Sequence, residues 1–351
     1  MWDEAAMRYP AVSTVNPGRR RKSQRVCRKA SSAPPLCSGR TDGVLLSGSV
    51  TIYIFVLPSG NPQAEREWMV TGKSRTMMKK AFEKSTYRFG NIPERVFDSG
   101  FGIYIHVPFC KTICGFCPFY KERFDEGRKD AYLKALRREI RQTRMHGTCS
   151  WLYIGGGTPN VLSVSELKGI LSEFPPELLP RSIGIELLPA LATSDYLSAL
   201  TDIGFTKISL GIESLREKTL RENRRNPVPH EHIRDLLRRA QELRLWSNVD
   251  MMVGLQGQDK NSFVADIEHL GSMAPSQVTI YPYMILRNST GNPSMDNREQ
   301  FALIEEAGRI LLNQGFERKG VWVWGKGADI YDSSRDELVT DYAGFGPTAF
   351  S

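Results

Sequence analysis

Short apolar runs alternate with amphipathic segments through the middle of the chain. Six apolar runs have the length of buried strands: residues 102–107, 151–154, 182–187, 207–210, 247–253 and 277–281. Apolar residues at helical spacing follow them in residues 127–146, 163–174, 194–203, 214–222 with 230–244, 262–273 and 299–314. This order predicts an α/β fold with a parallel sheet and right-handed crossovers. A full eight-stranded barrel and a partial barrel both satisfy the pattern.

Two loops at the expected carboxyl ends of strands carry the candidate chemistry, since working residues of such folds lie there. One loop contains Cys110, Cys114 and Cys117 at C-x3-C-x2-C spacing. Three thiolates can hold three irons of a [4Fe–4S] cluster and leave the fourth iron without a protein ligand. They could instead be three of four ligands of a structural zinc site, with His106 as a candidate fourth.

Composition places the chain among soluble globular proteins, with 40% apolar and 25% charged residues over 351 positions. The six cysteines cluster unevenly, which favours a reducing, cytoplasmic location over a disulfide framework. The net charge of +8 is concentrated in residues 1–43, with nine Lys/Arg against three Asp/Glu. The remaining chain carries 38 against 36, so nothing in its charge indicates a nucleic acid substrate.

Residues 1–68 are predicted to be a disordered or non-native leader: residues 1–43 lack hydrophobic periodicity, and the apolar residues 44–57 are interpreted as a strand or non-native sequence. The segment is basic and poor in acids, so it could be an organellar transit peptide. It could also precede a later start at Met69, Met77 or Met78, which fits its poor amphipathic pattern better. The apolar run at 44–57 is too short to predict a membrane span, and no membrane association is expected. Residues 69–100 form a lead-in.

The cysteine loop and the strand before it, from Tyr104-Ile-His-Val-Pro-Phe to Cys117, resemble the radical S-adenosylmethionine (SAM) enzymes. The resemblance is to their oxygen-independent coproporphyrinogen III oxidase-like (HemN/HemW-like) branch. It implies a partial (β/α)6 barrel over residues 101–285, in which the three cysteines bind a [4Fe–4S] cluster and SAM completes its fourth site. It also implies that residues 286–351 are a C-terminal helix and the start of a truncated accessory region.

The resemblance extends to the later strand ends, where Gly155-Gly-Gly-Thr-Pro159 matches the glycine motif of the branch. Glu213 stands where the branch has Gln, and Arg225 matches an arginine that meets the SAM carboxylate. Arg221, Arg224 and Arg225 could alternatively be a solvated basic run. The SAM contacts that the resemblance implies are Tyr104, Phe116, Gly156, Gly157, Thr158, Glu186, Glu213, Arg225 and Asp250.

This resemblance implies cleavage of SAM to a 5′-deoxyadenosyl radical that acts on a small tetrapyrrole-like substrate. A one-electron donor such as a flavodoxin or a ferredoxin would be needed. A heme-binding chaperone without oxidase activity and a radical SAM methyltransferase share the same core and remain alternatives. Two departures leave the final reaction open: Phe119 occupies the place of a fourth cysteine, and the chain ends at Ser351. No catalytic residue can be named from the sequence.

Overall fold

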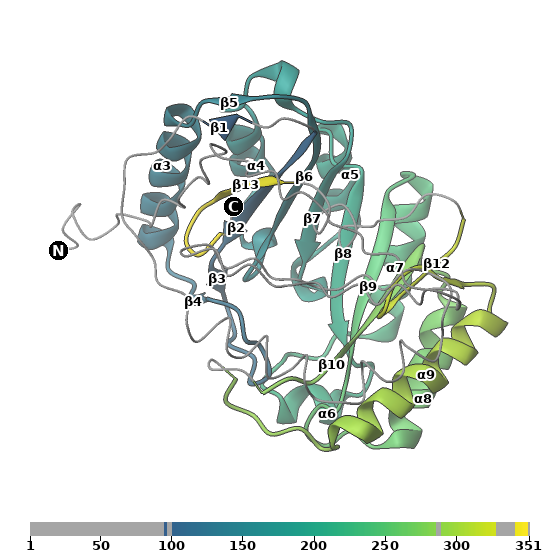
Figure 1. Ribbon diagram of the computed structural model, residues 1–351. Coiled ribbons are helices and arrows are strands. Elements are labelled where there is room, and N and C mark those ends of the chain that lie inside the picture. Colours follow the sequence, from purple (N-terminus) through teal and green to yellow (C-terminus); the bar gives the residue numbers. More distant parts are fainter. Residues whose placement is uncertain (1–94, 97–99, 286–288, 328–340, 350–351) are drawn as a thin grey trace, which may run out of the picture.

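The computed structural model describes residues 95–96, 100–285, 289–327 and 341–349. Within these residues the main sheet has nine strands in the order β11-β12-β10-β9-β8-β7-β6-β2-β13 (Figure 1). Its strands are β2 (Phe101–Val107), β6 (Cys149–Gly156), β7 (Ile183–Leu187), β8 (Lys207–Glu213), β9 (Trp246–Val253), β10 (Gln277–Pro282), β11 (Glu317–Arg318), β12 (Val323–Gly325) and β13 (Tyr342–Phe345). The predicted leader, residues 1–68, lies outside the described residues.

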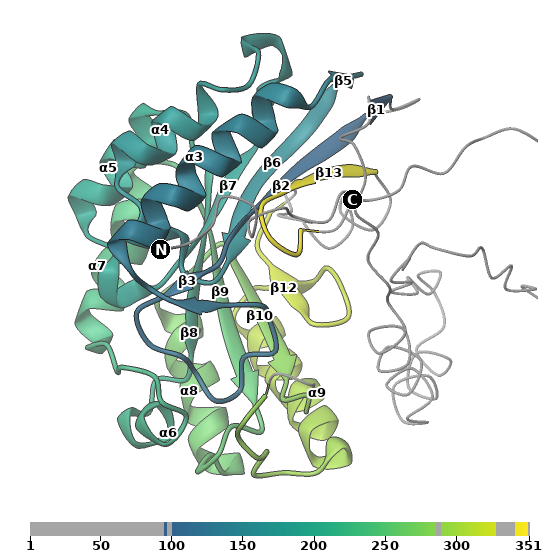
Figure 2. The same ribbon diagram turned by 90° about the vertical axis from the view of Figure 1, so that its left-hand side faces the viewer.

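The six predicted strands are present and pair in parallel, which confirms the predicted α/β partial barrel. The connecting helices lie on one face of the curved sheet (Figure 2). Their bounds are α3 (Glu126–Gln142), α4 (Val164–Leu171), α5 (Ser194–Asp202), α6 (Glu217–Glu222), α7 (His230–Glu242), α8 (Lys260–Ser272) and α9 (Asn297–Asn313). The carboxyl ends of the parallel strands therefore meet at one edge, as the sequence predicted.

Three strands of the sheet were not predicted, and all three follow the sixth strand–helix unit. β13 pairs in parallel with β2, and β12 pairs antiparallel with β10 and β11. These strands have only two to four residues, and β12 and β13 contain glycine, so they carry little periodic signal. The partner of β13 lies some 240 positions earlier in the chain, and local pattern cannot reveal such a pairing.

Several helix boundaries differ from the prediction by a few residues, among them the end of α3 and the start of α6. The helix predicted over 127–146 ends at Gln142, because Thr143 is extended and β5 (Met145–His146) pairs with β1 (Arg95–Val96). The helix predicted from residue 214 begins only at Glu217. The predicted start at Ser163 is confirmed, since its hydroxyl accepts a hydrogen bond from the Glu166 amide in a capping box.

The core lies between the sheet and its helices. On β2 the side chains of Phe101, Ile103, Ile105 and Val107 point to the helices and have no exposed surface. Alternate residues face the concave side, where the Trp151 ring covers Gly102. Among the described helices, none combines the length and apolar character that a membrane span requires.

We expect Gly102→Ala to lower the free energy of unfolding by about 1–3 kcal/mol, because overpacking a filled site forces its neighbours to shift. A β-carbon there would lie 2.0 Å from Trp151 ring atoms. Gly127→Ala in α3 is the matched control, since its β-carbon would meet nothing closer than 3.5 Å and alanine favours helix. Urea unfolding of the variants measures the difference, and equal stability of Gly102→Ala and wild type would contradict this packing.

Candidate active site

The cysteine loop leaves β2 and spans the interval between two short parallel strands, β3 (Phe109–Cys110) and β4 (Glu122–Arg123). Cys110 is buried, whereas Cys114 and Cys117 are partly buried. Phe116, between them, packs with Met252, Leu255 and Tyr283 beyond the ends of β9 and β10. The loop is therefore held at the carboxyl edge of the sheet, next to residues far along the chain (Figure 1).

The arrangement of the cysteines separates the two metal interpretations. A tetrahedral zinc site with Zn–S bonds of 2.3 Å brings its sulfurs to about 3.8 Å of one another. Within the described residues, Glu126, Asp130 and Glu166 are the set of three ligand atoms that all lie within 4.8 Å of one another, so at least two of the three cysteine sulfurs are farther apart than that. A four-iron cluster binds each thiolate to a different iron and suits wider spacing.

His106 is not placed as the fourth ligand that a zinc site would need. Its side chain is buried, and both ring nitrogens have partners. Nδ1 lies 3.2 Å from the Tyr104 hydroxyl, and Nε2 lies 3.1 Å from the Tyr120 carbonyl oxygen. Burial holds the pKa of His106 below its ordinary value. Through these two contacts His106 links β2 to the end of the cysteine loop. The predicted SAM contact Tyr104 lies on β2, two residues before His106.

The glycine loop after β6 packs directly on the cysteine loop. A β-carbon at Gly157 would lie within 2.9 Å of the backbone of Pro108 and Phe109, so only glycine fits. Gly156 has a φ of +113° and lies against the His106 ring. The Thr158 hydroxyl donates to the Cys110 sulfur at 3.5 Å. The three residues predicted from the glycine motif therefore adjoin the first cysteine.

Glu213 ends β8 in a strained conformation that aims its side chain at the site. The pairing with β9 shifts register between Gly211 and Glu213, and Glu213 has a φ of +67°. Such bulges redirect a side chain at a strand end, and non-glycine residues in this region cost of the order of 1–3 kcal/mol. The carboxylate lies 3.8 Å from the Arg225 guanidinium.

Arg225 is the one arginine of its basic run that turns inward. Its Nη1 donates to the Cys114 sulfur at 3.5 Å, and Nη2 donates to the Gly211 carbonyl oxygen. Its side chain is 13% exposed, whereas Arg221 and Arg224 are exposed. The solvated interpretation therefore holds for those two arginines and is wrong for Arg225. This guanidinium joins the cysteine loop to the end of β8.

Two further carboxylates lie on neighbouring strands. Glu186 on β7 accepts a hydrogen bond from the Gly156 amide at 3.0 Å. Asp250 on β9 accepts from the Ser209 hydroxyl at 2.5 Å and from the Asn248 amide group at 2.8 Å. Glu186, Glu213 and Asp250 interact electrostatically across three adjacent strands. The structure thus gathers three carboxylates near the cysteine loop, and Arg225 interacts with two of them, Glu213 and Asp250.

Comparison with known proteins agrees with this geometry. Residues 104–270 match the model of the radical SAM superfamily. The chain is 30% identical to an oxygen-independent coproporphyrinogen III oxidase of Pseudomonas aeruginosa over 192 residues, which cover 52% of this chain and 42% of that protein. It is 27% identical to the heme chaperone HemW of Lactococcus lactis over 191 residues, 53% of this chain and 50% of the chaperone. Residues 104–270 form a radical SAM domain.

A solved structure, the coproporphyrinogen III oxidase HemN of Escherichia coli, has the same fold as the radical SAM domain. The TM-score is 0.61 at 24% identity, covering 73% of this chain and 64% of that one. The two curated relatives described above carry the names of the coproporphyrinogen III oxidase-like (HemN/HemW-like) branch that the sequence resembles. The chain spans about half the length of these relatives.

Burial dominates the electrostatics of the carboxylates in the radical SAM domain. Burial, with a smaller contribution from the nearby Asp250, raises the pKa of Glu186 to about 8. Burial also raises the pKa of Glu213 to about 7, although Arg225 opposes the shift. The pKa of Asp250 rises less, to about 6, because Ser209 and Asn248 donate to its carboxylate. Each group would be stabilised in its charged form by a bound cation.

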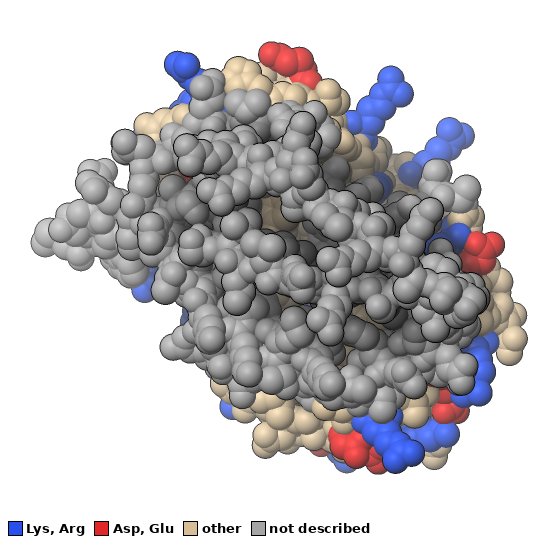
Figure 3. Space-filling model, in the orientation of Figure 1, with Lys and Arg blue, Asp and Glu red and all other residues tan. Residues whose placement is uncertain are grey.

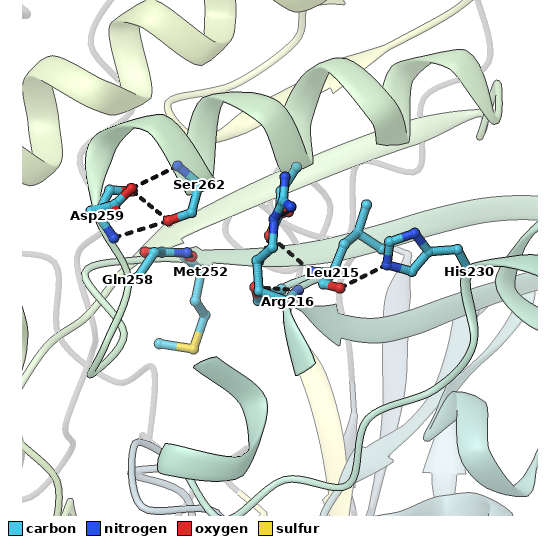
Figure 4. Close-up of polar contacts among 9 residues, drawn as sticks. Leu215, Arg216, His230, Met252, Gln258, Asp259 and Ser262 are labelled. Carbon is cyan, nitrogen blue, oxygen red and sulfur yellow. Dashed lines mark hydrogen bonds and ion pairs between the residues drawn. The ribbon is translucent and has the colours of Figure 1, made fainter. Parts of the chain in front are cut away.

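Sequence reasoning missed one residue that shapes this site. Asp266 on α8 is buried and accepts hydrogen bonds from the Ser214 hydroxyl, the Leu215 amide and Arg216 Nε at 2.7–2.9 Å. Figure 4 shows this turn, in which the Leu215 carbonyl oxygen also contacts His230. These bonds hold the segment directly after Glu213. A lone aspartate on a helix carries no signal of that role.

Charged side chains of both signs are visible around the rim of the face in Figure 3. On α7, Arg238 pairs with Asp235 and Glu242 of the same helix. Both observations agree with the near-neutral composition of the chain after residue 43.

We expect Glu186→Gln to stabilise the metal-free protein at alkaline pH. A carboxyl whose folded pKa is raised takes up a proton on folding, so its contribution falls as pH rises from 4.5 to about 8. The amide keeps an acceptor for the Gly156 N–H and removes this penalty. Between pH 5 and pH 8.5 the variant should gain of the order of 2 kcal/mol relative to wild type in urea unfolding. The exposed Glu268→Gln is the control, and parallel pH profiles for Glu186→Gln and wild type would contradict the shift.

Proposed function

We propose that this chain binds a [4Fe–4S] cluster and SAM and cleaves SAM reductively in porphyrin or heme metabolism. The observation that carries the proposal is the inward Arg225 guanidinium, which contacts the Cys114 sulfur and the Glu213 carboxylate. It joins the cysteine loop to a carboxylate that lies 99 positions after Cys114 in the chain. When bound, the cluster and SAM together supply a 5′-deoxyadenosyl radical, which abstracts hydrogen from a substrate.

The cluster would be held by Cys110, Cys114 and Cys117. Burial raises the pKa of Cys110, and that of Cys117 to about 11, so the thiols lose protons as iron binds. Thr158 and Arg225 donate to two of the sulfurs and would stabilise their negative charge. Three ligands on a buried loop leave one iron for a small-molecule ligand, which fits SAM.

The carboxylate pocket fits the charges of SAM. SAM carries an ammonium, a sulfonium and a carboxylate, and its ribose offers two hydroxyl donors. The forked Arg225 suits the carboxylate. Glu186, Glu213 and Asp250 suit the cationic groups and the ribose hydroxyls. The closely packed glycine loop, with Thr158, would form the wall beside the methionyl end.

The substrate proposed first is a porphyrinogen or another tetrapyrrole, since the first relative described above is a coproporphyrinogen III oxidase. A soluble one-electron donor such as a flavodoxin or a ferredoxin would supply the electron. The second candidate is a heme chaperone without oxidase activity, favoured by the similarity to HemW. Both would use the same cluster site.

The deciding experiment is anaerobic reconstitution with iron and sulfide, followed by dithionite and SAM. Formation of 5′-deoxyadenosine, and its increase with coproporphyrinogen III, would support the enzyme. Stoichiometric hemin binding and transfer without 5′-deoxyadenosine would support the chaperone instead. A colourless protein that binds about one zinc ion would exclude both.

Alanine at Cys110, Cys114 or Cys117 is expected to reduce iron from about four per chain to near zero, and to abolish SAM cleavage. Cys149→Ala is the matched control, because Cys149 is buried on β6 and its thiol donates to the Trp151 carbonyl oxygen. Iron analysis and the visible spectrum measure the effect. Full iron content in Cys114→Ala would refute the assigned ligand set.

Arg225→Lys is expected to weaken SAM binding by about 10- to 100-fold, because an ammonium cannot form the paired bonds of a guanidinium. The control is Arg224→Lys, one position earlier on an exposed side chain. Calorimetric titration of the reconstituted proteins with SAM gives both dissociation constants. Equal affinities for the two variants would show that Arg225 does not contact the ligand.

A further inference from the structure

A chain of buried polar side chains crosses the concave face of the sheet beneath Asp250. None of its members is more than 4% exposed, and they occupy three adjacent strands. Ser209 on β8 pairs with Asn248 on β9, which pairs with Gln277 on β10. We name this set the Asn248 network; its members are Ser209, Asn248, Gln277 and Thr279.

The hydrogen bonds of the Asn248 network are all donated in the direction that leads from β10 toward Asp250. The Asn248 carbonyl oxygen accepts from the Thr279 hydroxyl at 2.9 Å and from the Gln277 amide at 3.1 Å. These two donors fix which end of the Asn248 amide faces Asp250, since a carbonyl oxygen only accepts. The Asn248 NH₂ group then donates to Ser209 at 2.7 Å and to Asp250 at 2.8 Å.

Ser209 continues the same direction. Its hydroxyl oxygen accepts from Asn248, so its single proton is free to donate to Asp250 Oδ2 at 2.5 Å. Both oxygens of the Asp250 carboxylate therefore receive a hydrogen bond from the floor of the barrel. A protonated Asp250 would forfeit one of them, because a carboxylic acid must donate its own proton. The network favours the carboxylate and fixes its rotation.

We propose that the Asn248 network consists of positioning residues, which hold the Asp250 carboxylate in the orientation and charge state that SAM binding requires. The inference rests on the proposed function, because it assigns Asp250 to the SAM pocket. Orientation by a second layer of hydrogen bonds is how rigid sites keep a ligand contact in place. Chain position alone would not reveal the role, since the network spans residues 209 to 279.

The charged neighbours of Asp250 make such support necessary. Glu186 on β7 and Glu213 at the end of β8 both repel an added negative charge. Among the charged groups that interact with Asp250 in the described structure, Arg225 favours the negative charge of its carboxylate. The side of β10 that faces Asp250 contributes Thr279, which carries no charge. Without the network, burial and two acids would keep Asp250 protonated over a wider pH range.

The test measures the SAM dissociation constant of the reconstituted protein from pH 5 to pH 8.5. Affinity should fall in steps toward acid pH as the three carboxylates of the pocket become protonated, and the step at the lowest pH belongs to Asp250. Ser209→Ala removes one donor and should move the midpoint of this lowest step upward by about one pH unit. Thr279→Val should move it in the same direction by less. Ser209→Thr restores the hydroxyl and should restore the wild-type midpoint.

Ser247→Ala is the matched control. Ser247 is equally buried on β9, but it lies next to Asn248 on the opposite face and bonds with Ser276. Its midpoint should equal that of wild type. The inference would be overturned if the pH profile of SAM affinity were the same for Ser209→Ala and wild type, or if the affinity of wild type did not fall at acid pH. Either result would leave the proposal of SAM binding intact.

Failure of wild type to bind SAM at any pH would overturn the proposed function as well. Circular dichroism checks folding of each variant. If Ser209→Ala does not fold, Thr279→Val decides the result. Loss of folding in both would assign the network to stability alone and overturn the positioning role.

Discussion

One guanidinium holds the site together. Arg225 donates to the Cys114 sulfur and to the Gly211 carbonyl oxygen and faces the Glu213 carboxylate. A buried cation of this kind is costly unless every direction has a partner. The partners of Arg225 come from two segments, so the charge joins the cysteine loop to the end of β8. Glu213 keeps its left-handed backbone conformation because Arg225 holds its side chain and Asp266 holds the residues that follow it.

The parallel sheet supplies the geometry in which that charge can act. Carboxyl ends of adjacent parallel strands lie at one edge, so β7, β8 and β9 each bring one acid to the same place. Burial raises the pKa of each of these acids, and for Glu186 and Glu213 the neighbouring carboxylates raise it as well. A bound cation would favour the charged form of each acid.

Glycine has two separate uses at this edge. Gly156 and Gly157 were expected to let backbone approach a ligand, and in the structure they also let two loops approach each other. Gly211 leaves room for the Arg225 guanidinium, since a β-carbon there would lie 3.0 Å from it. The close packing of protein segments therefore already requires glycine at these positions, whether or not a ligand contacts them.

The sequence by itself determined the order of six strands and helices and the cysteine spacing, because both are local patterns of period and distance along the chain. The motif resemblance indicated Glu186, Glu213, Asp250 and Arg225 as site residues. The residue pattern did not show whether Arg225 is buried or is solvated like its neighbours. Only the tertiary structure decided which arginine turns inward, that His106 has both nitrogens engaged, and that β13 lies beside β2. The sequence also did not reveal the Asn248 network. Hydrogen bonds between strands depend on register, and register is set by packing across the whole sheet.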